Sequence, residues 1–201
     1  PASGVGSYVR VFDADGKLLA QRNAFASTFR GGVSVAAGTL NAAEPAHILT
    51  AAASGGTAEI SEYKFANGQL TLVRRSRPFG TLKNVGVALA LGNVDGKGAG
   101  EIVASLRRGS RSTVGVFQSN GRRLAVLATG KASAGTQWFV ASGDLLRFDR
   151  RDEIVVVDAQ STRARVQEFS LGTALRATSN VAAFFPLGKE RSGLSVAVGH
   201  L

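Results

Sequence analysis

Arginine side chains are the residues of this sequence whose type and spacing point most directly to a chemistry. The chain has 201 residues, with 24 Lys and Arg against 14 Asp and Glu, and a formal net charge of +10. The first 61 residues hold four basic and four acidic side chains, so the whole excess lies in the remainder. A positive field of this size attracts polyanions such as acidic polysaccharide, anionic lipid or nucleic acid.

Two arginine clusters supply the candidate ligand-binding residues. They are Arg107, Arg108, Arg111, Arg147, Arg150 and Arg151. Further clusters occur at 74–77 and 122–123. The alternative is a solvated arginine-rich surface, because the clusters lack the regular aromatic interleaving of a surface that stacks bases.

Residues for several other chemistries are missing from the sequence. Without Cys the chain has no disulfide, no thiol chemistry and no Cys-ligated zinc site, and its two His argue against a His-rich metal site. No G-x-S-x-G motif occurs, and residues 92–97 are one residue short of a phosphate-binding loop and lack its Ser or Thr. We predict that His47 is a loop residue rather than a catalytic base. The sequence therefore predicts no catalytic residue and no enzyme.

The elements that must position these residues are short strands that recur along the chain. One pattern is an alternating strand that ends in an aromatic residue and a turn, at 9–18, 62–70 and 114–124, with a weaker copy at 166–172. Its Asp-Gly and Asn-Gly pairs are strong hairpin-turn signals. The aromatic residues of this pattern are predicted to be core. They are Phe12, Tyr63, Phe65, Phe117 and Phe169.

A second pattern is an apolar strand that closes on glycine and is followed by an aliphatic residue. Its glycines, Gly38, Gly92, Gly143 and Gly199, are 54, 51 and 56 residues apart. A third strand follows each of the first three copies, starting at 47, 101 and 153. Helix-period stretches are absent, so the sequence predicts an all-β protein. Trp138, at the start of the third copy, is predicted to be core rather than an exposed platform for sugars.

The repeated unit has about 52 residues and about four β segments, which is typical of a propeller blade. We therefore predict a β-propeller or propeller-like array of about four four-stranded blades in a single repeat domain, 1–201. The units are approximately 33–84, 85–137 and 138–193. Residues 1–32 and 194–201 would complete one shared blade, which lacks its second strand. If the ring stays open, an edge is left for self-association or for a neighbouring domain.

The strand "YVRVFDADGKLL", the segment "FRGGVSVAAG" and the loop "GNVDGKGAGEIVAS" resemble the FG-GAP/VCBS-like repeats of bacterial surface and secreted proteins. These repeats are relatives of the blades in integrin α-subunit propellers, and the resemblance covers nearly the whole chain. It implies that the glycine-ended strands line a central channel and that the aromatic-ended strands lie further out.

The resemblance also implies a candidate Ca²⁺ loop, with Asn93, Asp95 and Glu101 as the ligands. Oxygen ligands at alternate positions can converge on one hard cation, and glycine allows the sharp turn. Lys97 departs from the family pattern, because it stands where an acidic ligand is expected and an ammonium offers no lone pair. Lys97 could instead replace the ion and hold Asp95 and Glu101 together. Apart from this degenerate Ca²⁺ loop, the sequence predicts no cofactor.

The first function that we predict is a non-catalytic module at the cell surface or outside the cell. It would serve adhesion, carbohydrate or protein contact, or spacing, by presenting loops on a rigid propeller. The alternative is a polyanion binder for acidic glycan or nucleic acid, which acts through the arginine clusters. A third and weaker alternative is the propeller part of an enzyme. No apolar run approaches the ~18–20 residues of a membrane-spanning helix, so we predict no membrane span.

Overall fold

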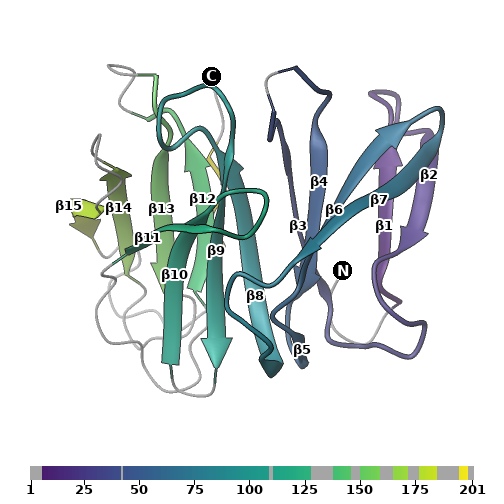
Figure 1. The fold of residues 1–201 in the computed structure, drawn as a ribbon, viewed down its shortest axis with the longest axis horizontal. Coiled ribbons are helices and arrows are strands. Elements are labelled where there is room, and N and C mark those ends of the chain that lie inside the picture. Colours follow the sequence, from purple (N-terminus) through teal and green to yellow (C-terminus); the bar gives the residue numbers. More distant parts are fainter. Residues whose placement is uncertain are drawn as a thin grey trace.

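The computed structural model (Figure 1) describes residues 6–41, 43–108, 111–127, 138–145, 150–158, 165–171, 177–184 and 195–198. For residues 111 and 177–184 it describes the backbone alone. Every regular element in these ranges is a β-strand, and none of their residues is helical. The prediction of an all-β protein is confirmed. Across the same ranges, no helix is long and apolar enough to cross a membrane.

The strands form four separate antiparallel sheets. The first is the hairpin β1 (Tyr8–Phe12) and β2 (Leu18–Asn23). The second has the order β3 (Val33–Gly38), β4 (His47–Ala52), β6 (Ile60–Ala66), β7 (Gln69–Ser76). The third has the order β11 (Arg123–Leu127), β10 (Arg111–Phe117), β9 (Glu101–Arg108), β8 (Lys83–Gly92), β5 (Gly56–Thr57). The fourth has the order β12 (Trp138–Gly143), β13 (Glu153–Asp158), β14 (Val166–Leu171), β15 (Ala177–Phe184).

Each of the last three sheets is a meander that starts from a glycine-ended strand. β3, β8 and β12 contain the first three copies of this pattern, and each pairs with the strand that follows it, β4, β9 or β13. The register places the closing glycine opposite the first residue of the next strand, as in Gly92 opposite Glu101 and Gly143 opposite Glu153. The short strand β5 extends the third sheet by pairing with β8.

One contact recurs at the three closing glycines that the structure describes, Gly38, Gly92 and Gly143. The glycine backbone lies against the residue that directly precedes the next closing glycine, and a Cβ there would overlap the neighbour. At Gly38 the added Cβ would lie 2.9 Å from Leu91 Cδ2, and at Gly92 it would lie 2.8 Å from Ser142 Cβ. Gly143 makes the same contact with Val198. The glycines therefore allow β3, β8, β12 and residues 195–198 to pack side by side.

The core lies in three layers between successive sheets. Val9 and Ala20 of the hairpin pack with Tyr63 and Leu70 of the second sheet. Leu49 and Ile60 of the second sheet pack with Val87 and Phe117 of the third. Val116 and Ala88 of the third sheet pack with Trp138 and Phe169 of the fourth. Because each layer is shared by two neighbours, each sheet is stabilised by the sheets beside it.

The predicted core aromatics fall into two groups. Tyr63, Phe117 and Phe169 are buried, and Trp138 is buried as predicted. Phe65 is only half-buried at the edge of its layer. The prediction for Phe12 is wrong, because its side chain is 52% exposed. Among the described residues, the sheet of Phe12 has only β1 and β2, without the inner strands that cover the equivalent residue in the other sheets.

The close approach at Gly92 gives a stability prediction. In Gly92→Ala the new methyl group would lie 2.5 Å from Asp152 Oδ2 and 2.6 Å from Ser142 Oγ, so the two sheets must separate slightly. We expect the free energy of unfolding to fall by roughly 1–3 kcal/mol, as measured by urea denaturation. Adding Ser142→Gly should restore part of the loss. Equal stability of Gly92→Ala and the wild type would contradict the contact.

Candidate functional site

The loops after the glycine-ended strands meet at one end of the sheets. The Gly100 amide donates to the Thr39 carbonyl over 2.8 Å, and the Asp152 amide donates to the Asn93 carbonyl over 3.0 Å. Gly100 and Asp152 each precede a second strand, and Thr39 and Asn93 each follow a closing glycine. The same backbone hydrogen bond thus joins each of these two loops to the next sheet. The Asp152 carboxylate adds a 2.8 Å bond from the Asn93 amide.

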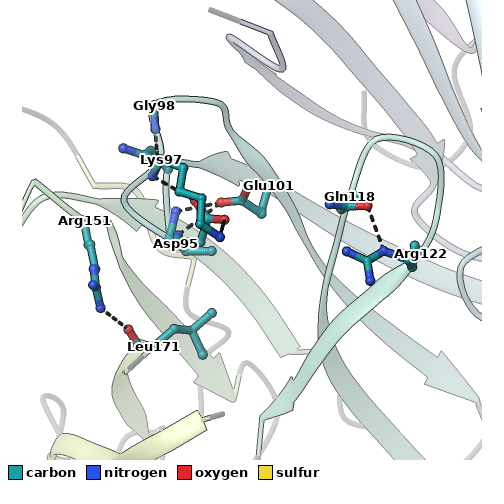
Figure 2. A network of polar contacts seen from close by, with 10 residues as sticks. Asp95, Lys97, Gly98, Glu101, Gln118, Arg122, Arg151 and Leu171 are labelled. Atoms are coloured by element: carbon teal, nitrogen blue, oxygen red, sulfur yellow. Dashed lines mark hydrogen bonds and ion pairs between the residues drawn. The ribbon is translucent and has the colours of Figure 1, made fainter. Parts of the chain in front are cut away.

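The candidate Ca²⁺ loop is the connection between β8 and β9, drawn in Figure 2. The Asp95 carboxylate accepts two hydrogen bonds from Lys97, one from the backbone amide of Lys97 at 2.9 Å and one from its Nζ at 3.0 Å. Asn93 Oδ1 accepts from the Gly98 amide at 3.0 Å, and Asn93 Nδ2 donates to the Arg150 carbonyl at 3.1 Å. The loop therefore holds its shape through its own side chains.

The Glu101 side chain folds back under this loop and accepts hydrogen bonds from its backbone amides. Its Oε2 accepts from the amides of Val94 at 3.1 Å and Asp95 at 3.2 Å, and the residue is only 6% exposed. Burial raises the pKa of Glu101 to about 7, and the nearby Asp95 charge adds to the rise. Glu153 repeats the arrangement in the next sheet, where its Oε2 accepts from the Leu145 amide at 2.9 Å.

The predicted metal ligands are brought into one loop, but their oxygens do not fit a divalent cation as they stand. The Lys97 ammonium lies against the Asp95 carboxylate, and Glu101 is committed to two amides. Lys97 therefore pairs with Asp95 and does not bridge it to Glu101. Within the described ranges, no group of three or more His, Cys, Asp and Glu side chains gathers in a way that could hold a metal ion.

His47 is a buried strand residue, so the prediction that it lies in a loop is wrong. It begins β4 and is 2% exposed. Its Nδ1 lies 2.7 Å from Oε1 of buried Glu62, and its Nε2 lies 3.0 Å from Glu44 Oε2 without hydrogen-bond geometry. Glu44 also binds Lys64 at 2.9 Å, and this bond lowers the pKa of the Glu44 carboxyl. His47 stands where the later sheets have Glu101 and Glu153, and that alignment was the only sequence signal for its burial.

The two predicted arginine clusters lie at opposite ends of the sheets. Arg151 lies beside the Asp95 loop, where its stem meets Gly96, and its Nη1 donates to the Leu171 carbonyl at 2.9 Å (Figure 2). Arg107 and Arg108 close β9 at the far end, because the register pairs Arg107 with Gly86 and Glu101 with Gly92. Arg111 starts β10 opposite Arg108, and its side chain is outside the described residues. Arg150 is exposed, and Arg147 lies outside the described residues.

A different set of arginines comes together between the second and third sheets. We call Arg74, Arg75, Arg77, Arg122 and Arg123 the inter-sheet arginine surface; all five are exposed. The turn 118–122 lies against β7, since a Cβ at Gly121 would be 3.2 Å from Ser76 Cβ. Arg74 donates to Ser119 Oγ at 3.4 Å. Arg122 donates to Gln118 Oε1 at 2.9 Å (Figure 2). Sequence spacing could not show this surface, because its two halves are more than 40 residues apart in the chain.

Among the described residues, Glu59 is the acidic side chain that pairs with the inter-sheet arginine surface, and an apolar pocket lies beside Arg123. Glu59 pairs with Arg75 at 3.3 Å and with Arg77 at 2.8 Å. A pocket of about 300 Å³ lies beside Arg123, with the edge-on aromatic pair Phe79 and Phe117 in its wall. Arg74, Arg122 and Arg123 therefore have no carboxylate partner among the described residues, and Arg123 lines the apolar pocket.

No protein-family model matches this chain, and no curated protein sequence matches it either.

The pKa of Glu101 gives a pH prediction. Between its ordinary value of 4.5 and about 7, the folded protein keeps a proton that the unfolded chain releases. The free energy of unfolding should therefore fall as pH rises through this window, by at most about 3 kcal/mol from this group. Glu101→Gln keeps an oxygen for the two amides and should remove that part of the slope in urea denaturation at several pH values. Asp15→Asn, an exposed control, should keep the wild-type slope; a parallel slope in Glu101→Gln would refute the assignment.

The Lys97–Asp95 pair gives a metal prediction. Replacing the ammonium by a carboxylate, in Lys97→Asp, supplies the oxygen that the family pattern has at this position and removes the internal cation. We expect Lys97→Asp to bind Ca²⁺ and the wild type to show no comparable heat, in titration calorimetry with CaCl₂. Lys97→Gln, which removes the ammonium without adding a carboxylate, is the control. Equal heats for Lys97→Asp and Lys97→Gln would show that the loop is not built on the metal-binding pattern.

Proposed function

We propose that this chain is a non-catalytic binding module that presents its loops and sheet edges on propeller-type blades. The observation that supports it most is the recurrence of one contact at Gly38, Gly92 and Gly143, which stacks similar sheets side by side as blades stack in a propeller. The polar groups at the loop ends also fit this role. Glu101, Glu153 and Asp152 bind backbone amides, which rigidifies the loops rather than leaving the carboxylates for substrate.

The cell surface or the extracellular space is the location that we propose for this module. It rests on the resemblance of the repeat to bacterial surface and secreted proteins. A rigid array of sheets with exposed loops suits contact with a glycan or a protein, since binding residues are commonly carried on loops that a scaffold positions.

The second candidate function is binding of a polyanion, and the inter-sheet arginine surface favours it. Arg74 and Arg122 bind polar side chains of the turn 118–122, and Arg123 directly follows that turn. Arg75 and Arg77 share the carboxylate of Glu59. Guanidinium groups present forked N–H donors that match sulfate, phosphate and carboxylate. Gln118 and Ser119 add further polar groups between the arginines. An acidic polysaccharide that follows the seam between the two sheets would contact several of these groups at once.

Binding of a sulfated polysaccharide tests the polyanion function. We expect heparin to bind the wild type with an affinity that falls steeply between about 50 and 200 mM salt. Arg122→Gln/Arg123→Gln should weaken binding about tenfold or more and reduce the slope of log K against log salt by roughly two. The affinity is measured by calorimetry at several salt concentrations.

The matched control is Arg108→Gln/Arg150→Gln, which removes the same charge from two exposed arginines at opposite ends of the sheets. It should change heparin affinity little. A larger loss in this control would move the site to the arginines predicted from sequence. Salt-insensitive binding of neutral glycans on an array, with no heparin binding, would instead leave the loop-presenting module as the function and remove the polyanion candidate.

A further inference from the structure

The hairpin β1–β2, at the purple end of the molecule in Figure 1, has the same local structure as the hairpin β10–β11. Both have an irregularity in register at the same place, between Val11 and Phe12 and between Val116 and Phe117. In both, the aromatic residue is the last paired residue before the turn, with Phe12 opposite Leu18 and Phe117 opposite Arg123. Phe12 and Phe117 are therefore structurally equivalent.

The two turns use the same pair of backbone hydrogen bonds. In the first, the Asp13 amide donates to Lys17 O and the Gly16 amide donates to Asp13 O, each over 3.1 Å. In the second, the Gln118 amide donates to Arg122 O and the Gly121 amide donates to Gln118 O, each over 2.9 Å. Gly16 and Gly121 both have positive φ, 82° and 87°. The hairpins are thus two copies of one element that differ in their surroundings.

The two hairpins differ at the other edge of their first strand, the edge of β1 that faces away from β2 and the edge of β10 that faces away from β11. β10 pairs along its whole length with β9, from Arg111 opposite Arg108 to Phe117 opposite Ile102. β1 pairs with β2 alone among the described residues. Phe117 is 1% exposed and Phe12 is 52% exposed. Within the part of the chain that the structure describes, β1 therefore has an unpaired edge, with a half-exposed aromatic side chain at its end.

The three complete sheets show what covers this aromatic residue elsewhere. In each of them an isoleucine stands directly opposite the aromatic residue on the neighbouring strand. The pairs are Ile48 with Tyr63, Ile102 with Phe117, and Ile154 with Phe169. The isoleucine always follows the His or Glu that begins its strand, in His47-Ile48, Glu101-Ile102 and Glu153-Ile154. These pairs show which sequence a strand beside β1 would have, and that it would run antiparallel to β1.

We propose that the edge of β1 binds an extended protein segment of the β9 type, antiparallel to Tyr8–Phe12, with an isoleucine opposite Phe12. The segment is a Glu or His, then Ile, then two or more apolar or small residues, supplied by a further repeat unit. Main-chain hydrogen bonds along β1 provide affinity, as in other cases of strand addition to a sheet edge. The Ile–Phe12 pair provides register and specificity, because a shift by one residue would place the isoleucine on the other face.

The test uses the chain as it is and a synthetic peptide with the sequence of Glu101–Arg108. We expect the peptide to slow hydrogen exchange of the backbone amides in Tyr8–Phe12, followed by NMR, with saturable binding. Phe12→Ser should weaken peptide binding by roughly tenfold or more, because the large apolar contact is lost. Since Phe12 is half-exposed in the free chain, the variant should fold as the wild type does.

Two controls make the result specific. Val126→Ser removes another exposed apolar side chain, 46% exposed on β11, and should leave peptide affinity unchanged. A peptide with aspartate in place of the isoleucine should bind at least tenfold more weakly than the first.

Three outcomes would overturn the proposal. One is no protection of the β1 amides at millimolar peptide. Another is protection of β10 instead of β1, which would mean that the peptide replaces β9. The third is slow exchange of the β1 amides in the free chain, since the edge would then be paired already. None of these results bears on heparin binding, so this proposal and the polyanion function stand or fall separately.

Discussion

Close approach of neighbouring glycine-ended strands is the constraint on which the rest of this structure depends. A Cβ at Gly38, Gly92 or Gly143 would overlap the next strand, so the side-chain-free backbone sets the distance between sheets. With that distance set, the layers between sheets can be filled by residues such as Val87, Phe117 and Trp138. The same approach brings successive loops within reach of one another's backbone, as in the bond from Gly100 to Thr39.

The buried acids at the loop ends follow from that arrangement. Glu101 and Glu153 are nearly inaccessible to solvent, and burial of a carboxylate is unfavourable unless donors compensate. Backbone amides of the preceding loop are the donors in both cases. His47 occupies the equivalent position in the second sheet, where its partner is the carboxylate of Glu62 and not a loop amide. Glu101 and Glu153, whose residue type suggests metal binding or acid–base chemistry, thus hold loops in place.

The strands themselves could be predicted because their signals are local. Alternating apolar residues, Asn-Gly and Asp-Gly turns and the spacing of the glycines all act within a few residues, and β3, β8 and β12 fall where these signals stand. The candidate loop 93–101 could also be located, but the partners of its side chains could not. Whether Lys97 faces Asp95 or Glu101 depends on how the loop folds back over β9, which depends on packing beyond the loop.

By itself, the sequence determined the all-β class, the repeating strand pattern and the burial of Trp138, Phe117 and Phe169, because periodicity and turn chemistry act locally. Only the tertiary structure decided which arginines meet. Arg74 reaches Ser119, near Arg122, because two sheets pack with β7 beside the turn 118–122. Arg108 and Arg151 lie far apart because β9 runs between the two ends of its sheet. The exposure of Phe12 was decided there too: its hairpin has the same local sequence signals as that of Phe117, and only the neighbouring strand differs.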